Sequence, residues 1–161
     1  MTGGRRLTAP LTVLVAIFVA DQITKLWVLH GADFSAGPIP ALPFMDITLV
    51  WNRGISYGLF QTEGVGRWVL VGVTMAGTGA LTVWLLRTRH TLLRFALAAI
   101  VGGAAGNLVD RVAYGAVVDF VHLHAYGWSW YVFNIADAAI VMGVLVLLWD
   151  SLFGGEKQTK R

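Results

Sequence analysis

The sequence predicts an all-α polytopic membrane protein of four transmembrane helices, with a small β-containing region in its outer-surface loops. Apolar residues make up 57% of the 161 residues and charged residues only 13%, whereas soluble domains average roughly 45–50% and 25%. The mean hydropathy is +0.68. Four apolar runs are each long enough to cross a hydrocarbon core about 30 Å thick. At this length we expect one domain, residues 1–161.

The four expected helices follow one another along the chain. The first covers about residues 11–29. Two arginines precede it as they would a signal peptide, but Asp and Gln follow its apolar run in place of a cleavage site, so we expect it to be retained. The second, about 68–86, has no charged residue and is the clearest of the four. The third, about 93–112, and the fourth, about 130–149, carry polar residues near one end.

The basic residues predict how the helices are oriented. If the helices alternate in direction, the basic residues near both ends of the chain and between the second and third helices fall on one side. These are Arg5, Arg6, Arg87, Arg89, Arg94, Lys157, Lys160 and Arg161. The positive-inside rule makes that side cytoplasmic. Residues 30–67 and 113–129 are then outer loops, and the β-like stretch 46–51 predicts a small sheet on the membrane surface.

Charge and cysteine content exclude several classes of function. The net charge is +3, but most of the basic residues lie at the chain ends and in one connection. A nucleic-acid-binding protein needs a continuous basic track, so we expect no nucleic-acid partner. The chain has no cysteine, which excludes disulfides, thiol nucleophiles and cysteine-ligated metals.

Ionisable and amide side chains gather near the predicted outer ends of three helices. They are Asp21, Lys25, Asp110, Arg111, Asn134 and Asp137. An ionisable residue at the centre of a membrane helix costs about 2.5–3.5 kcal/mol on insertion scales, so it usually pairs or belongs to a functional site. Asp21 and Lys25 are four residues apart on one helix face, which predicts an ion pair. Gly102 and Gly106 have the same spacing and predict close packing against a neighbouring helix.

Three chemistries are compatible with these residues. Two aspartates in a partly dry site can share a proton and activate water. Asp119, His122 and His124 are a possible ligand set for a metal ion. Residues 54–58 match G-x-S-x-G with Ser56 as a nucleophile, although the residues after this motif are poor helix formers. The alternative function is a small proton-coupled transporter or channel. It would carry polar residues through the full bilayer depth, whereas the inner halves of these helices are apolar.

Five blocks of the sequence resemble the lipoprotein signal peptidase family, also called signal peptidase II, in the family's order. They are residues 21–25, 52–58, 102–111, 118–120 and 133–137. The resemblance implies an aspartyl endopeptidase of the bacterial inner membrane, with no metal or other cofactor. Its implied partners are membrane lipid and prolipoproteins that carry a diacylglyceryl group. It would remove the signal peptide by cutting before the lipidated cysteine, near the outer face of the membrane.

The resemblance also implies roles for individual residues. The family's catalytic pair corresponds to Asp119 and Asp137. Its supporting polar residues correspond to Asp21, Lys25, Asn52, Asn107, Asp110, Arg111 and Asn134. Asp119 has no cation next to it in the sequence, so desolvation can raise its pKa toward neutral pH. Asp110 is followed by Arg111, which predicts an ionised carboxylate that holds this arginine rather than a partner that shares a proton.

Overall fold

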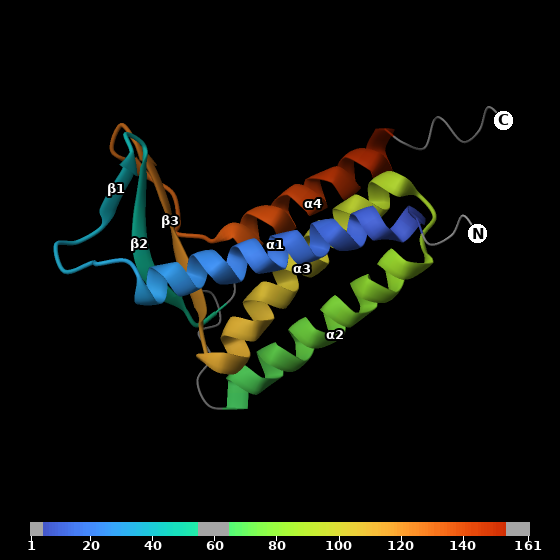
Figure 1. Cartoon of the computed structure of the whole chain (residues 1–161), viewed down its shortest axis with the longest axis horizontal. Helices are drawn as coiled ribbons and strands as arrows, with labels where there is room; N and C mark the ends of the chain where they lie inside the picture. The colour runs from blue at the N-terminus through green and yellow to red at the C-terminus, as the bar shows by residue number, and fades with distance from the viewer. Residues whose placement is uncertain (1–4, 55–64, 154–161) are drawn as a thin grey trace.

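A helical bundle with a sheet at one end makes up the computed structural model, which describes residues 5–54 and 65–153. Its four helices in these ranges are α1 (Arg5–His30), α2 (Val65–Arg87), α3 (Thr91–Ala113) and α4 (Ile135–Phe153). Each is long and apolar enough to cross a membrane, as predicted. In Figure 1 the start of α1, the end of α4 and the α2–α3 connection lie at the end of the bundle opposite the sheet.

The central helix is α3, which packs against the other three helices. Small residues allow this close packing. A Cβ added to Gly102 would lie 2.7 Å from the Leu14 carbonyl oxygen of α1, and one added to Gly103 would overlap the Ala136 carbonyl oxygen of α4. A Cβ added to Gly106 would overlap the Asp21 carboxylate of α1. The predicted close packing at Gly102 and Gly106 is therefore confirmed, and Gly103 extends it to α4.

A methyl group at Gly103 should therefore destabilise the protein. Because the atom it meets belongs to the backbone of α4, a side-chain rotation cannot relieve the overlap. We expect Gly103→Ala to lower the free energy of unfolding by about 1–3 kcal/mol, the usual cost of overpacking. Gly79→Ala is the matched control, because nothing lies within 4 Å of a Cβ at that position of α2. Thermal unfolding in detergent measures both; equal melting temperatures would contradict the packing role.

The fourth helix begins at Ile135, whereas the sequence predicted a start near residue 130. The preceding segment is extended because it pairs with strand β3 (Val117–Ala125). The N–H of Phe133 donates to the Val121 carbonyl oxygen at 3.0 Å, and the Val121 N–H donates back at 2.8 Å. Asn134 therefore lies just before α4 and not in its first turn.

Both long connections at this end of the bundle contribute to one antiparallel sheet. Its strands are β1 (Ile39–Leu42), β2 (Met45–Asn52), β3 and β4 (Trp128–Ser129), in the order β1-β2-β3-β4. The small sheet was predicted from the β2 segment alone. The nine-residue strand β3 falls within residues 113–129, for which the sequence predicts a loop. In the register of β2 with β3, Val50 pairs with Asp119 and Asn52 with Val117.

One face of β3 attaches the sheet to the helices. Val118 and Phe120 are buried in a cluster with Val28, near the end of α1. Successive side chains of a strand point to opposite faces, so the residue between them, Asp119, points the other way. The apolar contact of β3 with α1 thereby fixes the direction of the Asp119 side chain.

Candidate active site

All of the predicted site residues lie at the sheet end of the bundle, and five different elements bring them there. They are Asp21 and Lys25 from α1, Asn52 from β2, Asn107, Asp110 and Arg111 from α3, Asp119 from β3, and Asn134 and Asp137 at the start of α4. Most are buried and joined by hydrogen bonds, so they form one polar network inside the protein.

The start of α4 holds Asp137 in place. Asn134 precedes the helix, and its Oδ1 accepts the N–H of Asp137 at 2.9 Å. In return, Asp137 Oδ2 accepts the N–H of Asn134 at 3.4 Å. This reciprocal pair is a capping box, which satisfies N–H groups that have no partner within the helix. Asn107 of α3 donates from Nδ2 to Asp137 Oδ1 at 2.8 Å. Two elements therefore fix the direction of this carboxylate.

Asp119 is held between two amides and is only 2% exposed. Asn134 donates to its Oδ1 at 2.7 Å, and Asn52 donates to its Oδ2 at 3.0 Å. Burial, and after it the neighbouring carboxylate of Asp137, raises the pKa of Asp119 to about 7, although the two amide hydrogen bonds act in the opposite direction. At neutral pH such a carboxyl can give or take a proton easily.

Lys25 is the centre of a buried ion cluster. Its ammonium lies 2.8 Å from Asp21 Oδ2 and 2.7 Å from Asp110 Oδ2, and it donates to Asn107 Oδ1 at 3.0 Å. These contacts use all three N–H donors of the ammonium. The predicted Asp21–Lys25 pair is confirmed. Asp110 pairs with Lys25 and not, as predicted, with Arg111, because adjacent residues of a helix do not face each other.

Arg111 is directed toward backbone carbonyl groups. Its guanidinium donates to the carbonyl oxygen of Asn107 at 3.3 Å and to that of Gly54 at 3.1 Å. Its Nε atom is buried and has no hydrogen-bond partner in the described part of the chain. A guanidinium with a donor to spare is suited to bind a carbonyl or carboxylate oxygen.

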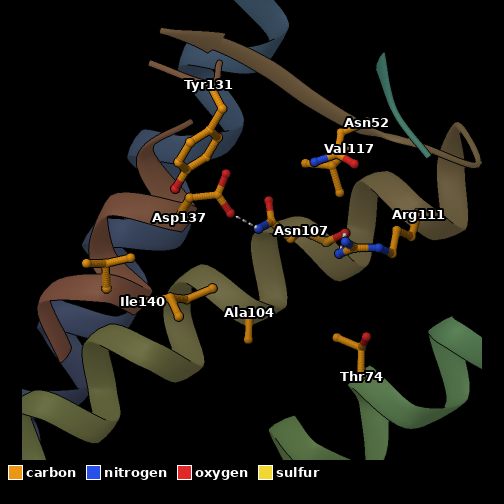
Figure 2. Close-up of a pocket in the computed structure, with 10 residues that line it drawn as sticks. Asn52, Thr74, Ala104, Asn107, Arg111, Val117, Tyr131, Asp137 and Ile140 are labelled. Carbon is orange, nitrogen blue, oxygen red and sulfur yellow. Dashed lines mark hydrogen bonds between the residues drawn. The ribbon is translucent and has the colours of Figure 1, made fainter. Parts of the chain in front are cut away.

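A cavity of about 200 Å³ lies beside this network (Figure 2). Asp137 and Asn107 face each other at its edge, and Thr74 of α2 lies on the opposite side. The lining residues are Asn52, Thr74, Ala104, Asn107, Arg111, Val117, Tyr131, Asp137, Ile140 and Val141. Asp119 is not among them, but the Asn52 amide both lines the cavity and binds Asp119. The cavity thus combines polar groups with apolar side chains from α3, β3 and α4.

Three residues of this region were missing from the predicted site. Gln22 donates to Asp21 Oδ2 at 3.2 Å and to Asp110 Oδ1 at 3.3 Å, and so joins two carboxylates of the ion cluster. Thr74 is a hydroxyl within an apolar helix, which is a signal that could have identified it. Tyr131 belongs to the segment that was predicted as helix, and no signal in the sequence indicated that it reaches the cavity.

The structure describes the residues of the alternative metal site but not the serine of the alternative nucleophile. His122 and His124 point to the opposite face of β3 from Asp119, because they lie an odd number of residues away. They lie near Asp46 of β2, at 3.9 and 3.0 Å from its Oδ2. Within residues 5–54 and 65–153, no group of three or more His, Cys, Asp or Glu side chains could hold a metal ion. Ser56 of the G-x-S-x-G pattern lies outside the described residues.

The raised pKa of Asp119 predicts the pH dependence of any reaction in which this carboxyl supplies a proton. Asp119 loses its proton as the pH rises through about 7, so the rate should fall above that pH. Asn52→Ala removes a hydrogen bond that favours the ionised form and should move this decline to higher pH. The pH profile of kcat measures both effects. Asp33→Asn, an exposed carboxyl outside the site, should leave the profile unchanged, and a decline insensitive to Asn52→Ala would contradict the assignment.

Comparisons of the sequence with known proteins agree on one family. The family described as signal peptidase (SPase) II matches residues 13–153. The lipoprotein signal peptidase of Methylorubrum extorquens (strain PA1) is 57% identical over 144 residues, which are 88% of this chain and 84% of that protein. The lipoprotein signal peptidase of Methylobacterium radiotolerans is 56% identical over 146 residues, 89% of this chain and 85% of that protein.

Two solved structures, each described as a bacterial membrane enzyme, have the same fold. The first superposes with a TM-score of 0.79 at 24% identity and covers 95% of this chain and 92% of its own. The second has a TM-score of 0.78 at 26% identity and covers 90% of this chain and 93% of its own. The arrangement of helices and sheet is therefore shared with membrane enzymes.

Proposed function

The chain belongs to the signal peptidase II family, and we propose that it cuts diacylglyceryl-modified bacterial prolipoproteins immediately before the lipidated cysteine. As a member of this family it is a multi-pass membrane peptidase that removes signal peptides from prolipoproteins. The proposal adds that Asp119 and Asp137 are its catalytic dyad. The remaining predicted site residues orient this dyad or bind the peptide. The single domain expected from the chain length stays a prediction.

The pair of carboxylates with different surroundings carries this proposal. Asp137 lines the cavity and accepts N–H groups from Asn107 and Asn134. Asp119 is buried beside it, with a pKa of about 7, and can hold a proton. Asp137 would take a proton from water while the water oxygen forms a bond to the scissile carbonyl carbon. Asp119 would give its proton to the leaving nitrogen as the C–N bond breaks.

Arg111 and the site amides would bind the peptide during this reaction. Arg111 and Asn52 both line the cavity and carry N–H donors. Donors fixed in place before the reaction stabilise the negative charge that develops on a carbonyl oxygen under attack. The neighbouring Asn107 amide is already bound to Asp137, so we assign it to positioning the dyad.

The residues that line the cavity favour a substrate that enters from the lipid phase. Thr74, Ala104 and Ile140 come from α2, α3 and α4, so three membrane-spanning helices surround it. An apolar signal-peptide helix could lie among these helices while its scissile bond reaches Asp137. Membrane lipid is thus a proposed partner, whereas the distribution of basic residues gives no reason to expect nucleic acid.

The orientation in the bacterial inner membrane is part of the proposal. We expect both termini in the cytoplasm and the sheet end outside, so a membrane-impermeant thiol reagent should label Ser35→Cys in intact spheroplasts. The chain has no native cysteine, and Ser35 is exposed on the loop before β1. Thr91→Cys, at the other end of the bundle, is the control and should react only after lysis. The reverse pattern would overturn both the orientation and the location of the site.

The substrate class can be tested with two peptides. The purified protein, in detergent or lipid, is given a prolipoprotein peptide with a diacylglyceryl-modified cysteine or the same peptide with a free cysteine. We expect the modified peptide alone to be cut efficiently, at the bond before the cysteine. Equal rates for both peptides would contradict lipid recognition. The alternative of a proton-coupled transporter or channel is not supported, because the chain belongs to a peptidase family.

A further inference from the structure

The two carboxylates bound to Lys25 each hold the backbone next to a proposed catalytic aspartate. Asp21 Oδ1 accepts the N–H of Ala136 at 2.9 Å, and Ala136 directly precedes Asp137. Asp110 Oδ2 accepts the N–H of Val118 at 3.2 Å, and Val118 directly precedes Asp119. One ammonium, itself 2% exposed, therefore ties together the two segments that carry the dyad, although they belong to different elements.

The third contact of Lys25 determines the orientation of the Asn107 amide. Asn107 Oδ1 accepts from the ammonium at 3.0 Å and from Asn134 Nδ2 at 3.2 Å. Both neighbours offer only donors in this direction. A reversed amide would place its NH₂ group against two donors and its oxygen against the Asp137 carboxylate. The ammonium thus ensures that Asn107 presents an N–H to Asp137.

We propose that Lys25 is the positioning residue of the dyad, which sets the separation of its two carboxylates and the orientation of the Asn107 amide toward Asp137. This inference rests on the proposed function. The backbone contacts of Asp21 and Asp110 fix where the two aspartates lie, and the Asn107 amide stabilises negative charge on Asp137. Lys25 acts only through these groups and does not touch the substrate.

The charges around the dyad come from four elements. They are Asp21 and Lys25 on α1, Asp110 and Arg111 on α3, Asp119 on β3, and Asp137 on α4. If the Lys25 ammonium is lost, the Asn107 amide can turn its oxygen toward Asp137, and the hydrogen bond that orients this carboxylate is then broken. The turnover of bound substrate should consequently fall.

The test compares two variants that differ only at position 25. Lys25→Met alone leaves two buried carboxylates without their cation and is liable to unfold, so Asp110→Asn serves as the reference. Lys25→Met is then added to it. We expect the double variant to have a kcat at least tenfold below that of Asp110→Asn and an almost unchanged KM. Equal melting temperatures establish that both variants are folded.

A double variant that keeps the kcat of Asp110→Asn would overturn the role of Lys25, as would an effect on KM alone. If the double variant unfolds, Lys25→Gln in the same background replaces it, with the same expected loss of kcat. A different result would show that the proposed function itself is wrong. In that case Asp119→Asn and Asp137→Asn would retain cleavage, whatever residue stands at position 25.

Discussion

Asp137→Asn is expected to abolish cleavage of a diacylglyceryl-modified prolipoprotein, while the protein stays folded and still binds its substrate. Asparagine keeps the size of the side chain and one oxygen, which can still accept the N–H of Asn134 in the capping box. It cannot take a proton from water, so the attacking nucleophile is not formed. Single-turnover cleavage and the melting temperature in detergent measure the two parts of this expectation.

Two controls separate the dyad from the other chemistries. Ser56→Ala should retain substantial turnover, because no hydroxyl nucleophile takes part in the proposed reaction. A chelator should have little effect, because the carboxylates are proposed to activate water directly. If chelation stopped the reaction and zinc restored it, the assignment would move to a metal site near His122 and His124.

Asp119→Asn should reduce kcat by at least ~10²–10⁴, the range for lost general acid–base catalysis. Its melting temperature should be nearly unchanged, because Asn134 still finds an oxygen acceptor and Asn52, at the cavity, can turn its amide. Asp110→Asn is the matched comparison. It removes a charge that pairs with Lys25 at 2.7 Å, so it should lower thermal stability or substrate affinity and leave most of the turnover of bound substrate.

The opposite result would identify a different carboxylate. If Asp119→Asn turned over at nearly the wild-type rate while a folded Asp110→Asn was inactive, Asp110 would be the partner of Asp137. Because both variants replace one carboxylate by an amide of equal size, a difference between them reports the role of the charge and not of packing.

The helices could be predicted from the sequence, because a membrane requires long apolar segments and these are visible in a single chain. The start of α4 could not be predicted in this way. Residues 130–133 continue the apolar run, and only their pairing with β3, a long-range contact, makes them extended. Strand β3 was missed for a related reason. Asp119, His122 and His124 interrupt its apolar pattern, and their burial depends on contacts with α4 and β2.

The site residues could be predicted from the resemblance to the family, whereas most of their hydrogen-bond and ion-pair partners could not. The Asp21–Lys25 pair could be predicted because the two residues are four apart on one helix. The partners of the Asp110 carboxylate are Lys25, 85 residues earlier, Gln22 and the N–H of Val118, and no local spacing indicates any of these contacts. Thr74 and Tyr131 reach the cavity through the packing of α2 and of the segment before α4, which the sequence alone does not specify.

The proton on Asp119 can be observed directly, and it tests the proposed dyad independently of turnover. Infrared difference spectra between wild type and Asp119→Asn should contain a protonated carboxyl band at neutral pH that disappears as the pH rises through about 7. In Asp137→Asn the band should still form, but its midpoint should lie at lower pH because a neighbouring negative charge is gone. A spectrum in which Asp119 is ionised throughout this range, or in which the band belongs to Asp137, would contradict a dyad with the proton on Asp119.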